Sequence, residues 1–154
     1  MTTPTVRRIL VAIDFSESAA LALEWARTLA RACGAQVTLL HVVDLGSTWV
    51  PLSGPAVFPA PVPAEVAKEV EELARASLDA VAPGAPEITQ RIVRAGHPRE
   101  AIAAAAREAG ADLIVVGSHG RRGVSQLFMG SVAEHVVRHA PVPVLVVRNG
   151  GRSA

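Results

Sequence analysis

The chain has 154 residues, a formal net charge of +1 and one cysteine, and half of its residues are apolar. Its length suits one domain with a substantial core, while the weak net charge and an aromatic content of 3% argue against a nucleic-acid-binding protein. Because one cysteine excludes an internal disulfide framework and we find neither a bilayer-spanning apolar run nor a signal-peptide pattern, we expect a cytoplasmic protein that does not act at a membrane.

Strand and helix patterns alternate along the chain. Short, continuously apolar runs predict strands that are buried on both faces of a sheet, and apolar residues at three- or four-residue intervals predict helices. In chain order these segments are a strand at 9–13, a helix at 16–33, a strand at 37–43, a helix at 63–82, a strand at 87–93, a helix at 98–109, a strand at 113–116, a helix at 131–139 and a strand at 142–147.

Two of the predicted helices have a clear apolar stripe. In helix 16–33, Leu21, Trp25 and Leu29 recur every four residues and Ala22, Ala26 and Ala30 widen the stripe, so we expect this stripe to face the core. The face that we expect helix 63–82 to bury carries Val66, Val70, Leu73, Ser77 and Val81.

The alternation predicts an α/β fold. Five strands that alternate with helices favour parallel pairing through right-handed crossovers. We predict a single doubly wound, Rossmann-like domain over residues 1–154, with a five-stranded parallel sheet of order 3-2-1-4-5 and helices on both faces. Pro143 cannot donate to a ladder and places the last strand at an edge. Asp14 and Gly117 then follow the first and fourth strands, at the switch point where such sheets bind ligands.

The segment 44–62 breaks the alternation and is rich in proline. Connections of this length are usually functional or disordered. Two interpretations stay open: a variable, partly ordered loop, or a lid in which Trp49 and Phe58 pack. Residues 149–154 are predicted to form a flexible tail.

A glycine-rich stretch, GSHGRRGVSQLFMGS, lies between the fourth strand and the fourth helix. It has neither the Walker pattern, nor the dinucleotide fingerprint, nor the spacing of a nucleophile elbow. Gly117 and Gly120 would let the backbone approach a ligand, and a helix that begins at Gly130 and Ser131 would favour a phosphate at its N-terminus. Ser131 also fits a capping box with Glu134, so a structural role competes with a ligand role.

Several other polar residues have two interpretations. Asp14 would cap the first helix or accept hydrogen bonds from a ligand, with no preference between the two. Arg121 and Arg122 would add charge to an anion site or be solvated. Cys33 is expected to be a small buried residue rather than a nucleophile. His135 and His139 share a helix face, for which a solvated helix end is favoured over a metal site.

The glycine spacing resembles that of a known family. Gly117, Gly120, Gly130 and Ser131 are similar to the G-x2-G-x9-G-[S/T] pattern of the universal stress protein family, and the first strand, His41-Val42-Val43 and residues 141–147 resemble its other strands. The resemblance covers nearly the whole chain and implies its ATP-binding branch. By position, the implied nucleotide-binding residues are Ala12, Ile13, Asp14, Val42, Val116, Gly117, His119, Gly120, Arg121, Gly130, Ser131, Val132 and Ala133.

The resemblance implies a nucleotide-dependent regulator of the stress response, with at most slow ATP hydrolysis and no assigned catalytic residue. Mg²⁺ or Mn²⁺ would sit on the phosphates without a protein metal site. Family members usually dimerise through the last strand, so a homodimer through Val142–Val147 is expected, beside a regulatory partner that the sequence does not identify. Ala133 departs from the pattern, because ATP-binding members often carry a hydroxyl there.

Two alternatives remain open. The first is an ATP-consuming enzyme on the same scaffold, although His119 is the one titrating side chain in the loop and no general base is otherwise placed. The second is an interaction module that binds no nucleotide, against which the open glycines argue.

Overall fold

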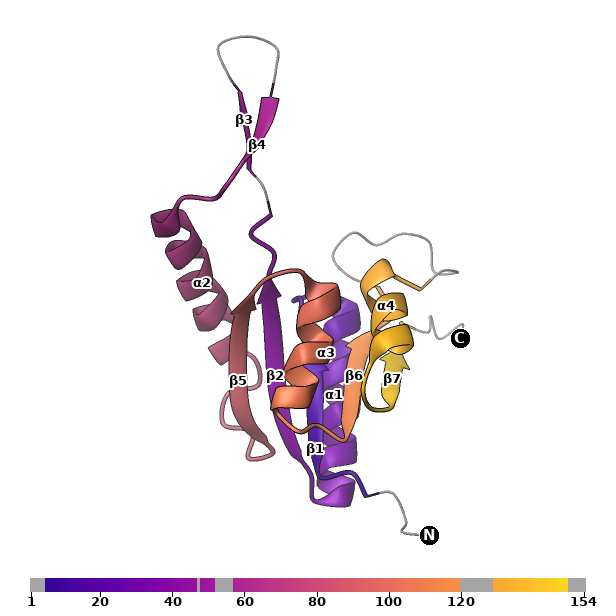
Figure 1. The fold of residues 1–154 in the computed structure, drawn as a ribbon. Helices are drawn as coiled ribbons and strands as arrows, with labels where there is room; N and C mark the ends of the chain where they lie inside the picture. The colour runs from indigo at the N-terminus through magenta and orange to yellow at the C-terminus, as the bar shows by residue number, and fades with distance from the viewer. Residues whose placement is uncertain (1–4, 47, 52–56, 120–128, 150–154) are drawn as a thin grey trace.

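The computed structural model describes residues 5–46, 48–51, 57–119 and 129–149. Its main sheet is parallel throughout and has the order β5-β2-β1-β6-β7 (Figure 1). This is the predicted order 3-2-1-4-5, with the fifth predicted strand at an edge. The strands of this sheet are β1 (Arg8–Ala12), β2 (Gln36–Val43), β5 (Ile88–Ala95), β6 (Leu113–Gly117) and β7 (Val144–Val147).

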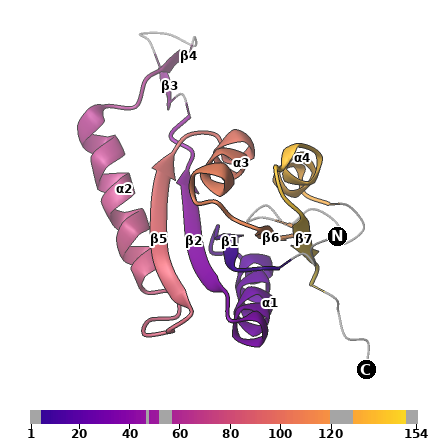
Figure 2. The same cartoon turned by 60° about the horizontal axis from the view of Figure 1, so that its bottom comes forward.

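Helices cover both faces of the sheet (Figure 2). The helices are α1 (Glu17–Cys33) and α2 (Ala64–Asp79) on one face, and α3 (Pro98–Glu108) and α4 (Ser131–His139) on the other. Strand β1 lies in the middle and sends Ile9 and Val11 into the core under α1, while Leu10 enters the core under α3 and α4. Burial on both faces explains why this strand is continuously apolar. Within the described residues, no helix is long and apolar enough to cross a membrane.

Helix α1 packs through a face of small residues. Ser16 is its N-cap, and Gly34 ends it with a left-handed φ of 68°. Its buried face is formed mainly by alanines, whereas Leu21 is 37% exposed and Trp25 is 52% exposed. The prediction that these two residues face the core was wrong. Ala22, Ala26 and Ala30 of the same predicted stripe are buried, and Leu29 packs partly against the core. Cys33, predicted to be buried, is exposed.

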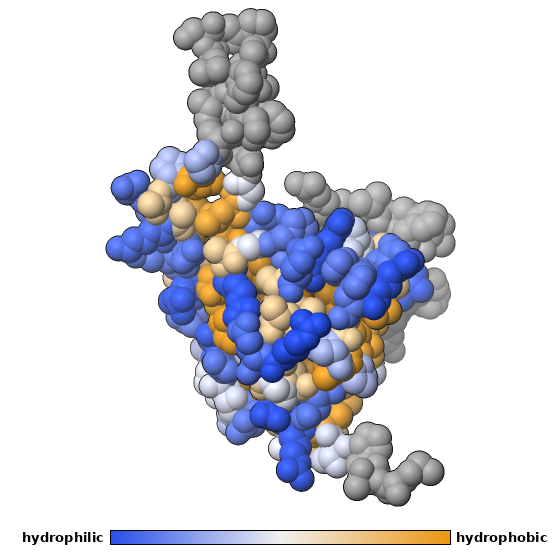
Figure 3. Space-filling view, viewed as in Figure 1, coloured by the Kyte–Doolittle hydropathy of each residue, from blue (hydrophilic) through white to orange (hydrophobic). Residues whose placement is uncertain are grey.

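Helix α2 shows the same error in its predicted face. Ala74 and Leu78 are buried, while Val66 and Val70 are exposed and Leu73 is 69% exposed. The helix packs on β5 and β2 at one side of the sheet, so only a narrow face is covered. Apolar surface is visible beside the upper end of α2 in Figure 3.

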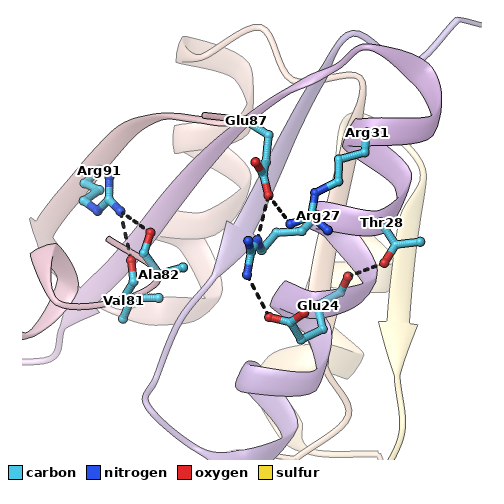
Figure 4. Close-up of polar contacts among 8 residues, drawn as sticks. All are labelled: Glu24, Arg27, Thr28, Arg31, Val81, Ala82, Glu87 and Arg91. Atoms are coloured by element: carbon cyan, nitrogen blue, oxygen red, sulfur yellow. Dashed lines mark hydrogen bonds and ion pairs between the residues drawn. The ribbon is translucent and has the colours of Figure 1, made fainter. Parts of the chain in front are cut away.

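A buried carboxylate joins α1 to the segment before β5 (Figure 4). Glu87 Oε1 accepts hydrogen bonds from Arg27 Nε at 2.7 Å and from Arg31 Nη2 at 2.9 Å, and the Glu87 side chain is 6% exposed. The hydrogen bond from Arg27 is the main cause that lowers the pKa of Glu87 to about 2.

The C-terminal end of α2 is closed by an arginine from β5, also drawn in Figure 4. Arg91 donates hydrogen bonds to the carbonyl oxygens of Leu78 at 3.3 Å, Val81 at 2.9 Å and Ala82 at 3.3 Å. Leu78 lies in the last turn of α2, and Val81 and Ala82 follow the helix. Arg91 therefore links the edge strand to the turn in which α2 ends.

The segment predicted as an irregular connection forms a hairpin. Strand β3 (Thr48–Pro51) pairs antiparallel with β4 (Val57–Ala60), and Figure 1 shows the hairpin standing away from the body of the domain. The period-two pattern is obscured in the sequence by prolines, which is why the strands were missed. The side chains of Trp49 and Phe58, and the predicted tail after Asn149, lie outside the described part of the chain.

Candidate functional site

A pocket of about 600 Å³ opens at the carboxyl ends of the central strands, where β1 and β6 diverge toward helices on opposite faces. It lies at the switch point predicted from the topology. Its walls come from the ends of β1, β2 and β6 and from the first turns of α3 and α4. The lining residues are Ala12, Ile13, Asp14, Ala19, Leu40, Val42, Asp44, His97, Pro98, Arg99, Ile102, Val116, Gly117, Ser118, His119, Met129, Gly130, Ser131, Val132 and Ala133.

The turn after β1 is organised by Asp14. Its Oδ1 accepts hydrogen bonds from the Ser16 N–H at 3.0 Å and from the Ser16 hydroxyl, and the Ser16 hydroxyl oxygen in turn accepts one from the Ala19 N–H at 3.2 Å. Phe15 adopts a left-handed φ of 63° in this turn. The N-cap of α1 is Ser16, whereas one of the two interpretations assigned this role to Asp14. Asp14 holds the capping serine and also lines the pocket.

His41 braces the same corner from β2. His41 Nδ1 donates a hydrogen bond to the Ile13 carbonyl oxygen at 2.6 Å. The centroids of the His41 and Phe15 rings are 4.6 Å apart. The Ile13 N–H donates to the Leu40 carbonyl at 2.8 Å. Because both backbone groups of Ile13 are already bonded, the corner is rigid before any ligand enters.

Gly117 has a packing role that the sequence did not reveal. A Cβ at this position would lie 2.1 Å from Ser18 Oγ and 2.8 Å from the Ser18 carbonyl carbon. Glycine is therefore required for α1 to approach the end of β6, whether or not a ligand is present. The predicted ligand role of Gly117 stays a prediction, although the residue does line the pocket.

The two ends of the glycine-rich stretch are tied together at Ser118. This residue is 2% exposed; its carbonyl accepts the Gly130 N–H at 2.7 Å and its hydroxyl lies 2.8 Å from His119 Nδ1. The His119 N–H donates to Ser18 Oγ at 3.3 Å. The second ring nitrogen, His119 Nε2, is buried and has no hydrogen-bond partner among the described residues.

Helix α4 begins without the predicted capping box. Gly130 is the N-cap, with an extended ψ of 150°, and Ser131 is the first helical residue. Glu134 does not reach back toward Ser131, because its carboxylate pairs with Arg138 at 2.9 Å. Glycine leaves the N-terminal turn without a side-chain cap, so its backbone N–H groups remain available toward the pocket.

The start of α3 forms a wall that sequence analysis missed. His97, Pro98, Arg99 and Ile102 line the pocket from this helix, and Asp44 joins them from the end of β2. The usable signal was topological: the loops that follow parallel strands gather at one edge of the sheet.

The predicted site residues within the described part of the chain all line this pocket, from Ala12 to Ala133. Gly120 and Arg121 lie outside that part. His135 and His139 stack at 4.1 Å near the far end of α4, and His139 Nδ1 donates to the His135 carbonyl. No group of three potential metal-ligating side chains is present within the described residues.

Comparisons with known proteins agree with this architecture. The model of the universal stress protein family matches residues 5–148. The universal stress protein YxiE of Bacillus subtilis is 34% identical over 145 residues, which cover 92% of this chain and 98% of YxiE.

Two solved structures are also similar. Universal stress protein UspA from Lactobacillus plantarum has a TM-score of 0.71 and 30% identity, covering 95% of this chain and all of that one. A universal stress protein in complex with cAMP has a TM-score of 0.62 and 26% identity, covering 95% of this chain and 99% of that chain. The chain belongs to the universal stress protein family.

Proposed function

We propose that this protein binds ATP in the pocket at the carboxyl edge of the sheet and acts as a nucleotide-dependent regulator of the stress response. The observation that carries the proposal is the meeting, in one pocket, of apolar strand ends with the glycine-started N-terminus of α4. The first suits a nucleoside and the second suits a phosphate. A relative of the family has been solved in complex with cAMP, which supports an adenine nucleotide as the ligand class.

The apolar side of the pocket is assigned to the nucleoside. Ala12, Leu40, Val42 and Val116 come from the ends of three neighbouring strands and present small or aliphatic side chains. Such a wall holds a base through packing and backbone contacts rather than through charge. The carboxylate of Asp14 stands beside this wall and would accept a hydrogen bond from a ribose hydroxyl.

The phosphates are assigned to the start of α4. Ser131 and Val132 offer backbone N–H groups at the positive end of the helix, and the exposed Ser131 hydroxyl adds a donor. His119 Nε2, buried without a partner in the described residues, gives the ligand a further polar contact. Ala133 is buried and adds no polar side chain.

We propose that a metal ion would be held in the pocket mainly by the bound nucleotide rather than by protein side chains. Asp14 and Asp44 are its carboxylates, and no cluster of three metal-ligating side chains occurs in the described residues. Mg²⁺ or Mn²⁺ would therefore take most of its ligands from the phosphates and water, as Mg²⁺ commonly does, and would neutralise part of their charge.

Regulation is favoured over catalysis by the chemistry that the pocket holds. His119 is tied to Ser118 through Nδ1, and neither Asp14 nor Asp44 is free of structural hydrogen bonds, since Asp44 accepts one from the Gly46 N–H at 3.2 Å. No side chain is thereby assigned as a general base for rapid hydrolysis. At most slow turnover is proposed.

A homodimer through β7 accompanies this proposal. Strand β7 lies at an edge of the sheet, and Val144, Leu145 and Val146 are only half-buried. Pairing with the same strand of a second copy would cover this edge, which would otherwise favour aggregation. Light scattering of the purified protein measures the mass, and a strictly monomeric protein at micromolar concentration would contradict the dimer.

Calorimetric titration with ATP and Mg²⁺ tests the proposed function. We expect saturable binding with competition by ADP and AMP, and at least about tenfold weaker binding for Gly130→Asp, because a carboxylate then occupies the phosphate position. Aspartate is also a good N-cap, so this variant should keep its thermal stability. A folded wild-type protein that gives no heat with any adenine nucleotide would refute the proposal.

A further inference from the structure

Arg99 is a charged residue on the pocket wall, and its buried side-chain Nε has no hydrogen-bond partner within the described residues. The structure leaves two buried side-chain nitrogens unpaired within the described residues, Arg99 Nε and His119 Nε2. Both residues line the same pocket, from α3 and from the end of β6. Arg99 Nε is a donor, whereas His119 Nε2 donates or accepts according to the tautomer of the ring. A buried donor without an acceptor is unfavourable, so Arg99 points to an acceptor that a ligand in this pocket would supply.

The position of Arg99 on α3 directs its side chain inward. Arg99 precedes Ile102 by three residues, so the two lie on one face of the helix. Ile102 is 2% exposed and belongs to the core that also contains Ala133 and Val136 of α4. The Arg99 side chain therefore lies one turn above this core, on the side of α3 that lines the pocket.

No carboxylate among the described residues forms an ion pair with Arg99. None of the ion pairs in the described part of the chain includes it. The carboxylates of the pocket, Asp14 and Asp44, each accept a hydrogen bond from the backbone of their own turn. A guanidinium that faces a pocket without a carboxylate partner is suited to a phosphate, which it can bind through two N–H groups.

We propose that Arg99 binds a phosphate group of the nucleotide, opposite the N-terminus of α4. This inference rests on the proposed nucleotide binding and adds a residue that lies outside the glycine pattern. In this arrangement α4 supplies backbone donors on one side and Arg99 supplies the full positive charge on the other. The ligand would provide the acceptor that Arg99 Nε lacks within the described residues.

Calorimetry with adenosine, AMP and ATP on four proteins tests the inference. The four proteins are the wild type, Arg99→Met, Arg99→Lys and Arg107→Gln. Arg99→Met removes the charge and Nε, whereas Arg99→Lys keeps the charge. Arg107 is an exposed residue of the same helix that lies outside the pocket, so Arg107→Gln is the control. We expect Arg99→Met to weaken ATP and AMP binding by about tenfold to a hundredfold and to change adenosine binding less than twofold. Arg99→Lys should retain part of the affinity, and Arg107→Gln all of it.

A thermal melt without ligand separates a binding role from a structural one. Since Arg99→Met removes an unpaired buried donor, the ligand-free variant should be as stable as the wild type or more stable. The inference would be overturned if Arg99→Met bound ATP as tightly as Arg107→Gln does. It would also be overturned if Arg99→Met lost equal affinity for adenosine and for ATP, or if both Arg99 variants were less stable than the wild type without ligand. If the wild type binds no nucleotide, the proposed function fails and the inference falls with it.

Discussion

Replacing Gly117 by alanine tests whether close packing, rather than a ligand, requires glycine at the end of β6. The new Cβ would lie 2.1 Å from Ser18 Oγ, 2.8 Å from the Ser18 carbonyl carbon and 3.0 Å from the Ala19 nitrogen. Two of these atoms belong to the backbone of α1, so the helix itself would have to recede from the sheet by roughly half an ångström. Overpacking of this kind costs about 1–3 kcal/mol.

Urea denaturation of the ligand-free protein, followed by circular dichroism, measures this cost. Gly34→Ala is the matched control: Gly34 has a φ of +68° and nothing within 4 Å of a new Cβ, so alanine is strained there but not crowded. Ser18→Ala should relieve part of the Gly117→Ala defect, because the 2.1 Å contact disappears while the backbone contacts remain. A Gly117→Ala protein as stable as the wild type, or a defect that Ser18→Ala leaves unchanged, would refute this reasoning.

Three further predictions follow from the packing and the ion pairs. Leu78 is fully buried, so Leu78→Ala should lower the free energy of unfolding by about 2–5 kcal/mol. Leu73 is 69% exposed, so Leu73→Ala should change it by less than about 0.5 kcal/mol. Equal losses of unfolding free energy, measured by urea denaturation, would contradict the packing of α2. Because the folded pKa of Glu87 is lowered to about 2, its contribution to stability is fully present above its ordinary pKa and is lost as the pH falls toward 2. Glu87→Gln should therefore be less stable than the wild type at pH 7, with a difference that shrinks by pH 3, whereas Glu72→Gln, at the exposed pair with Lys68, should show no such trend. Arg91→Leu removes hydrogen bonds to the carbonyls at the end of α2, and hydrogen exchange should show faster opening of that end, with α3 unchanged as the internal reference.

The strands could be predicted because their signals are local, and the strand order was then inferred from their alternation with helices. Continuous apolar runs mark strands that are buried on both faces, and Pro143 marks an edge. The pocket could be located for the same reason, since Asp14 and Gly117 follow adjacent strands in that order. The position of the glycine pattern, between β6 and α4, needed no knowledge of side-chain packing.

The buried faces of α1 and α2 could be predicted only in part from the apolar stripes. Leucine, valine and tryptophan dominate any count of hydrophobic residues, but the alanines of α1 allow the closest approach to the sheet. The same limit hid the reason for Gly117, which lies in a contact with Ser18 that is distant in sequence. Arg99 was missed because its place in the pocket depends on how α3 crosses the sheet.

Nitrogen-15 chemical-shift mapping with ATP tests the central claim most directly, because it locates the ligand as well as detecting it. The account predicts saturable shifts of the backbone amides at Asp14, Val42, Arg99, His119 and Ser131, and their absence in Gly130→Asp at the same ATP concentration. Shifts confined to other surfaces, such as the exposed side of α2, or no shifts at millimolar ATP, would contradict it.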